Sequence, residues 1–269
     1  MEILEIFGYL SSLLIGISLG LIGSGGSILT VPVLVYLLSV EPVLATSYSL
    51  VIVGVTALTG AVKSYMKGIV DLKIATVFAI PSFIAVFLTR LYIMPAIPDP
   101  IFVSSAFVIT KAIAIMVFFA VIMLLAAYSM VRSSKAVVDA EPSKAVFNYP
   151  LIIAEGLIVG VLTGLVGAGG GFLIIPALVL FAKLPMKLAV GTSLVIIAAK
   201  SLIGFTGDLA ISRDIDWMLL AAVSILAIVG MFIGSWLSNY ISASSLKKGF
   251  GYFVVAMAVF IFTKEIFIQ

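Results

Sequence analysis

The stretch GLIGSGGSILTVPVL, residues 20–34, returns in altered form as GLVGAGGGFLIIPAL at residues 164–178. Glycine and proline are the poorest helix formers, yet both stretches lie inside long apolar runs. Non-helical backbone within a membrane is tolerated only where protein buries it or where it lines a wet cavity. The chain therefore contains two equivalent and costly helix breaks, and these breaks indicate both its construction and its site.

The composition is that of a membrane protein. Of the 269 residues, 63% are hydrophobic and 10% are charged, whereas a soluble domain is about half apolar and about a quarter charged. Apolar runs of about 20 residues, enough to cross a hydrocarbon core, recur along the chain. We therefore predict an all-α polytopic membrane protein with about eight transmembrane helices. The predicted spans are 3–22, 43–66, 71–95, 107–130, 150–166, 187–206, 216–240 and 247–267.

The chain divides into two related halves. Residues 16–60 align without a gap on residues 160–204, at a constant offset of 144 positions, with shared glycines, a shared proline and shared small residues. Such self-similarity indicates an internal duplication, which is the common construction of secondary transporters and also occurs in channels. The prediction is a first transmembrane repeat at 1–131, a linker at 132–149 and a second repeat at 150–269, with glycine-rich breaks in the first and fifth spans.

Several classes of function are excluded by what the sequence lacks. Cysteine and histidine are absent, which removes disulfides, thiol chemistry, imidazole bases and the usual zinc ligand sets. No motif of a membrane-embedded enzyme is present. The net charge of +3 is too small to indicate a nucleic-acid partner. We therefore predict no enzyme, no cofactor and no metal, and the expected partners are the lipid bilayer and a small solute, with a homodimer left open.

Residues 3–38 are too long for a single span, because one straight helix of this length would run about 54 Å. We expect the glycine cluster to divide the segment into two helical pieces. A helix start exposes unpaired N–H groups and a positive dipole end, so two such starts that face each other would form a cradle for an oxyanion. Whether the broken segments cross the membrane or double back, and thus whether the repeats are parallel or inverted, stays open.

The residues predicted to form this cradle are small and lie at the two breaks: Gly23, Ser24, Gly25, Gly26 and Ser27, then Gly167, Gly169, Gly170 and Gly171. Pro32 and Pro176 follow, and they are expected to kink or end the short helices. Close helix packing is the alternative reading of small residues in membrane helices. Packing is preferred for the four glycines that precede the clusters: Gly16, Gly20, Gly160 and Gly164.

A second paired element opens the spans that follow, reading LATSYSL at 44–50 and LAVGTSL at 188–194. Its predicted substrate-binding residues are Thr46, Ser47 and Ser49 in the first half and Gly191, Thr192 and Ser193 in the second. These hydroxyl groups either cap their own helix or donate hydrogen bonds to the oxygens of a bound anion, and both readings stay open.

The two glycine–proline elements, together with AVGTSL at 189–194, resemble the signature of the TauE/SafE sulfite exporter family, also called the toluenesulfonate uptake permeases. The resemblance covers nearly the whole chain. It implies a prokaryotic inner-membrane carrier for sulfite, sulfonates or related small organic anions, driven by the proton-motive force. The family positions carried over are Gly23, Gly25, Gly26, Pro32, Gly167, Gly169, Gly170, Gly171, Pro176, Ala189, Gly191, Thr192 and Ser193. The first half departs from the pattern at Ser27 and at Ser47.

Ionisable residues inside predicted spans are functional candidates, because their burial in lipid is costly. Lys200 lies more than a dozen residues into its span and is predicted to be the counter-charge of the anion, with snorkelling as the alternative. Glu155 and Asp208 are the candidates for carrying a coupling proton, although an interfacial position explains both equally well. Three residues near span ends are expected to snorkel: Lys63, Arg90 and Lys111.

The predicted function is secondary transport of sulfite, sulfonates or related small organic anions across the plasma membrane, with export favoured and protons as the coupling ion. Two alternatives remain. A passive anion channel is one, because broken helices also line channels, and a carrier for a non-sulfur carboxylate is the other. The lysines and arginines are too evenly divided between the two sides to predict the orientation of the chain ends.

Overall fold

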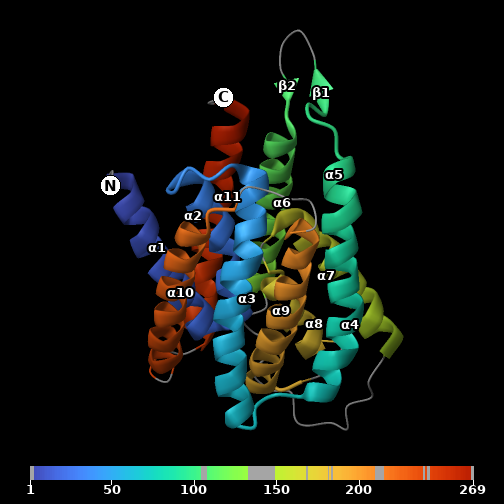
Figure 1. The fold of residues 1–269 in the computed structure, drawn as a ribbon. Coiled ribbons are helices and arrows are strands. Elements are labelled where there is room, and N and C mark those ends of the chain that lie inside the picture. The colour runs from blue at the N-terminus through green and yellow to red at the C-terminus, as the bar shows by residue number, and fades with distance from the viewer. Residues whose placement is uncertain are drawn as a thin grey trace.

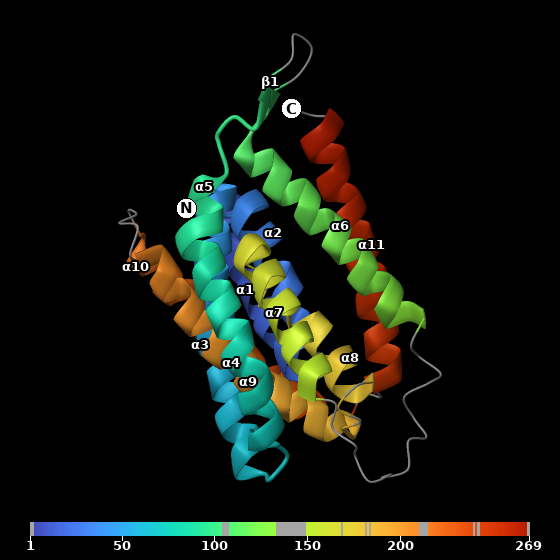
Figure 2. The ribbon, with the colours of Figure 1, turned by 90° about the vertical axis from the view of Figure 1, so that its right-hand side faces the viewer.

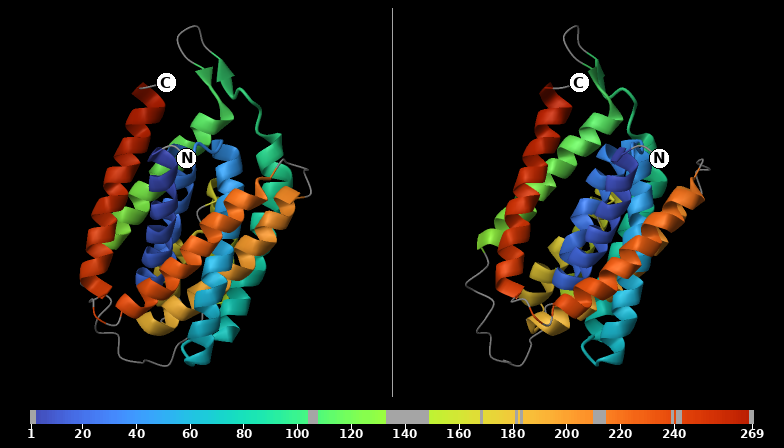
Figure 3. Two further views of the ribbon diagram at one scale, coloured as in Figure 1. Left: turned by 60° about the vertical axis from the view of Figure 1, so that its left-hand side comes forward. Right: turned by 90° about the vertical axis from the view of Figure 1, so that its left-hand side faces the viewer.

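Long helices run between the two ends of the molecule, and a short β-hairpin projects from one of these ends (Figure 1). The computed structural model describes residues 3–103, 108–132, 149–167, 169–180, 182, 184–209, 215–238, 240 and 243–267. Both ends of the chain lie at the end of the molecule that carries the hairpin (Figure 3).

The first half of the chain contains α1 (Ile3–Ile22), the 3-10 helix η1 (Ser24–Leu29), α2 (Thr30–Tyr36), α3 (Pro42–Met66), α4 (Leu72–Leu88), the π-helix η2 (Thr89–Ile93), α5 (Met94–Ala96) and α6 (Lys111–Arg132). Strands β1 (Phe102–Val103) and β2 (Val108–Ile109) pair antiparallel before α6. The second half contains α7 (Tyr149–Val166), α8 (Gly171–Leu180), α9 (Met186–Leu209), α10 (Trp217–Leu237) and α11 (Ala243–Phe267).

The predicted span 107–130 begins too early, because β2 precedes α6 there. The other predicted spans each correspond to one helix or to a continuous run of helices, which confirms a helical, polytopic membrane protein. In the described part of the chain, six helices are long and apolar enough to cross a membrane, and two apolar helices are shorter, Gly26–Tyr36 and Pro150–Val166. The count of eight spans and the division into two repeats remain predictions. Residues 133–148 of the predicted linker lie outside the described residues.

Acidic side chains fix where three of the long helices begin. The carboxylates of Glu41, Asp71 and Asp216 each accept a hydrogen bond from the backbone N–H three residues later, at the starts of α3, α4 and α10. Such N-caps satisfy a donor that the helix itself leaves unpaired. The polar residues between the apolar runs therefore set the helix boundaries.

The two glycine clusters turn the chain back on itself. Gly23 has a φ of 76° and Gly167 a φ of 74°, in the left-handed region that glycine adopts without strain. After the first cluster η1 and α2 return along α1, and after the second cluster α8 returns along α7 (Figures 1 and 2). The broken segments therefore double back, which settles the question that the sequence left open.

Helices α3 and α9, which follow the two breaks, pack against each other and run in opposite directions. A Cβ at Gly54 of α3 would lie 2.9 Å from the Leu202 side chain of α9, whereas a Cβ at Gly60 would lie 3.1 Å from Leu194. A forward step on one helix thus corresponds to a backward step on the other. Segments that match in sequence are therefore antiparallel in space.

Each broken helix packs on a helix from the other half of the chain. Helix α1 runs beside α10, and a Cβ at Gly16 would lie 1.9 Å from the Ala227 carbonyl oxygen. Helix α7 runs beside α4 in the same way, and a Cβ at Gly160 would lie 2.5 Å from the Ser82 carbonyl oxygen. The packing role is thereby confirmed for all four glycines that precede the clusters: Gly16, Gly20, Gly160 and Gly164.

Replacing Gly16 by Ala should destabilise the protein by forcing α1 away from α10. The clash is with backbone, which no side-chain rotation relieves, so we expect a loss of at least about 2 kcal/mol. Thermal unfolding of the detergent-solubilised protein measures this loss. Gly249→Ala is the matched control, because a Cβ there meets nothing within 4 Å and alanine is the better helix former. Equal melting temperatures for the two variants would contradict the packing.

The turn after α3 and the segment before the β-hairpin should lie on opposite sides of the membrane. Lys67 and Ile101 are exposed, and α4 with η2 and α5 connects the two places (Figure 1). The chain has no cysteine, so Lys67→Cys and Ile101→Cys each introduce a single thiol. We expect a membrane-impermeant maleimide to label one variant in right-side-out vesicles and the other in inverted vesicles. Labelling of both from the same side would refute the arrangement.

Candidate functional site

The two glycine breaks lie against each other. A Cβ at Gly169, in the turn before α8, would lie 3.2 Å from the Cβ of Ser27 in η1 and 2.7 Å from the Val53 side chain of α3. Gly169 and Gly170 have φ values of 65° and 59°, so this turn requires glycine. The structure thus brings together the two segments that the sequence predicted as one site.

Each break also packs on the start of the long helix from the other half. A Cβ at Gly23 would lie 2.7 Å from the Val190 side chain of α9, and a Cβ at Gly167 would lie 2.3 Å from the Thr46 carbonyl oxygen of α3. Gly26 differs, because it packs on its own α1, where a Cβ would lie 2.2 Å from Ser18 Oγ. Protein therefore covers both breaks.

The two breaks continue as different kinds of helix. The first continues as the 3-10 helix η1, which contains Ser24 and Gly25, and only then as α2. The second leads directly into α8 at Gly171, with the N–H groups of residues 173 and 174 donating to the Gly170 carbonyl oxygen. The second break therefore supplies the more regular helix start.

Lys200 places a buried amine beside the second break. Its side chain is fully buried, and its Nζ donates a hydrogen bond of 2.8 Å to Thr163 Oγ1 of α7. A Cβ at Gly170 would lie 2.7 Å from Nζ, so the ammonium lies against the turn from which α8 starts. An ammonium carries three N–H donors, and Thr163 is its one hydrogen-bond partner in the described part of the chain. Snorkelling of Lys200 is therefore excluded.

The hydroxyl residues of the paired element lie at opposite ends of the α3–α9 pair. Thr46 and Ser47 donate to the Val43 carbonyl oxygen at 2.7 and 3.4 Å, near the start of α3. The hydroxyl of Thr192, near the start of α9, accepts a hydrogen bond of 3.0 Å from the Asp71 N–H. Because α3 and α9 are antiparallel, these two groups do not converge on one ligand.

The other residues of the paired element also contact neighbouring protein groups. Ser193 donates to the Val190 carbonyl oxygen at 2.8 Å. A Cβ at Gly191 would lie 2.1 Å from the Ile69 carbonyl oxygen, so this glycine allows close packing on the turn between α3 and α4. Ser49 is fully buried, and its hydroxyl makes no hydrogen bond within the described residues.

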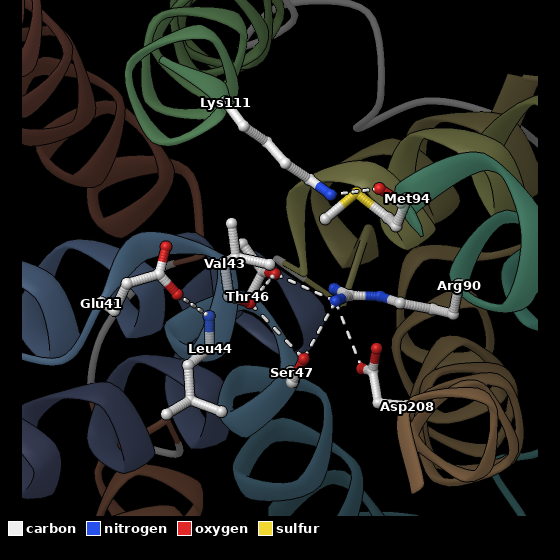
Figure 4. A network of polar contacts seen from close by, with 9 residues as sticks. All are labelled: Glu41, Val43, Leu44, Thr46, Ser47, Arg90, Met94, Lys111 and Asp208. Carbon is white, nitrogen blue, oxygen red and sulfur yellow. Dashed lines mark hydrogen bonds and ion pairs between the residues drawn. The ribbon is translucent and has the colours of Figure 1, made fainter. Parts of the chain in front are cut away.

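A second polar cluster, which joins η2, α3 and α9, contains Arg90, Asp208, Thr46 and Ser47 (Figure 4). Arg90 Nη1 lies 3.0 Å from Thr46 Oγ1, 3.2 Å from Ser47 Oγ and 3.2 Å from Asp208 Oδ2. The Arg90 side chain is 0% exposed and that of Asp208 is 2% exposed. The expectation that Arg90 snorkels is therefore wrong, and the Asp208 carboxylate is buried within the protein. Burial of each charge is compensated by the other.

The remaining predicted residues lie outside these two clusters. Glu155 is half-buried on α7, and its carboxylate makes no hydrogen bond or ion pair within the described residues. Pro32 and Pro176 lie inside α2 and α8, and both helices continue beyond them, so neither proline ends its helix. Lys111 is half-buried and donates from its Nζ to the Met94 carbonyl oxygen (Figure 4).

Sequence reasoning missed Arg90 as a candidate site residue. One signal was available, because Arg90 is the single arginine inside the predicted spans. A guanidinium stays protonated in proteins, so an arginine at membrane depth needs a partner of opposite charge. Asp208, the acid at the end of another span, is that partner.

Comparisons with known proteins agree on the family. The chain matches, over residues 9–261, the model of the family described as sulfite exporter TauE/SafE. A probable membrane transporter protein of Xylella fastidiosa is 30% identical over 252 residues, which cover 92% of this chain and 91% of that protein. The probable membrane transporter protein YunE of Bacillus subtilis is 30% identical over 254 residues, with coverages of 85% and 83%. No solved structure gives a significant match.

The family match spans most of the chain, and the relatives that align over most of their length are named as membrane transporters. The six long apolar helices are those of a protein that crosses the bilayer several times. The chain therefore belongs to the sulfite exporter TauE/SafE family of membrane transporters and is a multi-pass protein of the plasma membrane.

Proposed function

We propose that the chain is a secondary transporter that exports sulfite, sulfonates or related small organic anions across the plasma membrane, with protons as the coupling ion. The observation that carries this proposal is the position of Lys200. Its ammonium is fully buried and lies against the glycine turn before α8, where the two breaks meet. The description of the family names sulfite as the exported ion, which agrees with a buried cation at this place.

The chemistry of this place favours a small oxyanion. A buried ammonium without a counter-ion costs several kcal/mol, and Lys200 has no ion-pair partner among the described residues. An anion bound beside it would offset that cost. The start of α8 adds the positive end of a helix dipole. Sulfite and sulfonate groups present several acceptor oxygens around one centre, which suits donors that approach from different helices.

The helix packing supports two inverted repeats, residues 1–131 and 150–269, joined by the linker 132–149. The contact of α1 with α10 has its equivalent in that of α7 with α4, and α3 packs on its own counterpart α9. Carriers of this construction hold the substrate at the repeat interface and expose it alternately to the two sides. Glu155 and Asp208 are the candidates for carrying the coupling proton.

Replacing Lys200 by Gln should remove anion binding. The panel is sulfite, sulfate, thiosulfate, methanesulfonate, acetate and lactate, and the readout is the rise in melting temperature of the purified protein. We expect sulfur oxyanions to stabilise the wild type and to bind Lys200→Gln at least about tenfold more weakly, as expected for the loss of one charged hydrogen bond. Lys63→Gln is the control, because that lysine is only half-buried. Stabilisation by acetate and lactate alone would favour the carboxylate alternative, and an unchanged response of Lys200→Gln would disprove the site.

Counterflow separates a carrier from a channel. Proteoliposomes loaded with unlabelled sulfite should take up radiolabelled sulfite faster than empty ones, because a carrier returns its binding site with a substrate bound. We expect this stimulation in the wild type and its loss in Lys200→Gln. Uptake that internal sulfite does not accelerate, and that only follows the membrane potential, would support the passive channel.

A further inference from the structure

Arg90 forms a second buried cationic centre, apart from Lys200 but connected to it. Its partner Asp208 lies on α9 beyond Lys200, about 12 Å further along the helix axis. Gly167, in the second glycine break, packs on Thr46, where a Cβ would lie 2.3 Å from the Thr46 carbonyl oxygen. The glycine break thus touches both centres.

Arg90 Nη1 is surrounded by three oxygen atoms that face it as hydrogen-bond or charge acceptors, as the oxygens of an oxyanion would. Both hydroxyl groups in contact, those of Thr46 and Ser47, donate their own protons to the Val43 carbonyl oxygen and offer Arg90 only lone pairs. Arginine stays protonated, so its buried charge needs an anion in every state of the protein. In this structure the carboxylate of Asp208 supplies the negative charge (Figure 4).

In the described part of the chain, the carboxylate of Asp208 makes only one close contact with the Arg90 guanidinium. Its Oδ2 lies at the ion-pair distance of 3.2 Å from Arg90 Nη1, and both carboxylate oxygens are buried and accept no hydrogen bond within the described residues. A guanidinium holds an oxyanion best through two parallel contacts. A sulfonate or sulfite group has three oxygens and can present two of them at once. Such a group brings more oxygens toward Arg90 Nη1 than the one carboxylate oxygen that lies there in this structure.

Arg90 is the ionisable group that faces Asp208 in the described part of the chain. The elements packed on α9 are α3, α4, η2, α8 and η1, and the last two contain no ionisable residue. The other ionisable residues of these elements lie at the far helix ends, are exposed or are bonded elsewhere: Lys63, Tyr65, Lys73, Tyr92 and Tyr48. A carboxylate displaced from Arg90 would thus lose its counter-charge.

We propose that Arg90, Thr46 and Ser47 form a second binding site for the transported oxyanion, and that Asp208 occupies it as an internal anion until substrate displaces it. This inference rests on the proposed function, because its ligand is the transported anion. The displaced carboxylate takes a proton from solvent, so that an O–H bond forms on Asp208 and the negative charge that enters with the anion replaces the one neutralised. Each anion bound at Arg90 therefore takes up one proton.

This site exists at one end of the molecule only. At the offset of 144 positions Ser64 corresponds to Asp208. The capping residues Asp71 of α4 and Asp216 of α10 are 145 positions apart, so Ser235 corresponds to Arg90. Neither counterpart is charged. Proton and anion therefore meet near the face that carries the chain ends. A divalent anion moved with one proton keeps a net negative charge, so an inside-negative membrane potential still favours its exit.

The test uses methanesulfonate and the purified full-length protein, with isothermal titration calorimetry in buffers of different ionisation heat. Methanesulfonate keeps one negative charge between about pH 5.5 and about pH 8, so any proton taken up enters the protein. In Lys200→Gln, which lacks the first site, binding should be weak. Adding Asp208→Asn should tighten it at least about tenfold, an ordinary size for a coupling between sites, and adding Arg90→Gln as well should abolish it.

Proton uptake gives the second readout. We expect uptake on methanesulfonate binding in the wild type and none in Asp208→Asn, whereas uptake lost in Glu155→Gln but kept in Asp208→Asn would contradict the inference. If Asp208→Asn does not fold even with methanesulfonate present, Lys200→Gln decides, because methanesulfonate binding to this variant without proton uptake overturns the inference.

Different results would disprove the proposed function at Lys200 and the second site at Arg90. Wild-type binding that Lys200→Gln removes and Asp208→Asn does not restore would keep the proposed function and overturn the Arg90 site. Binding that appears only after Asp208→Asn, and that Arg90→Gln removes, would support the Arg90 site and count against the proposed role of Lys200.

Discussion

A peptide backbone that leaves helical geometry inside a membrane has to be covered by protein, because lipid offers its polar groups no hydrogen-bond partners. In this chain each break is covered by the other half. Ser27 lies against Gly169, and Gly23 and Gly167 pack on the starts of α9 and α3. Each half also covers part of its own break, since Gly26 packs on α1 and Gly170 on α7. Neither cover is complete without the other half, so the two halves that the sequence distinguishes do not form separate units in space.

The packing of each broken segment on the other half also explains the glycines outside the breaks. A segment that doubles back fills only part of the thickness that a full span would fill, and a neighbouring long helix has to close around it. Helix α10 does so for α1 and α4 does so for α7, at distances that leave no room for a Cβ at Gly16 or Gly160. Close backbone approach replaces the hydrophobic effect as the source of helix association in lipid. Small residues therefore follow from the breaks and are not an independent feature.

The positions of the helices were predictable from the sequence, because bilayer thickness fixes the length of an apolar run. The predicted spans 43–66 and 187–206 correspond to α3, Pro42–Met66, and α9, Met186–Leu209. Their antiparallel packing was not predictable, since it depends on whether the broken segments return. For the same reason Thr46 and Thr192, which open equivalent helices, were expected at one ligand and lie at opposite ends. The pairing of Arg90 with Asp208 joins two distant segments that no local pattern connects.

The scaffold is nearly symmetric, and its charges are not. Lys200, Arg90 and Asp208 have the uncharged counterparts Thr56, Ser235 and Ser64 in the other half. A protein with two identical inverted halves would present the same binding groups to both sides of the membrane. A preferred direction of transport therefore has to come from a chemical difference between the two halves. The buried ammonium lies where the two breaks meet, a place that belongs to both halves, whereas the guanidinium and its carboxylate lie toward one face only. The first charge is suited to holding an anion from either side, and the second distinguishes the two sides.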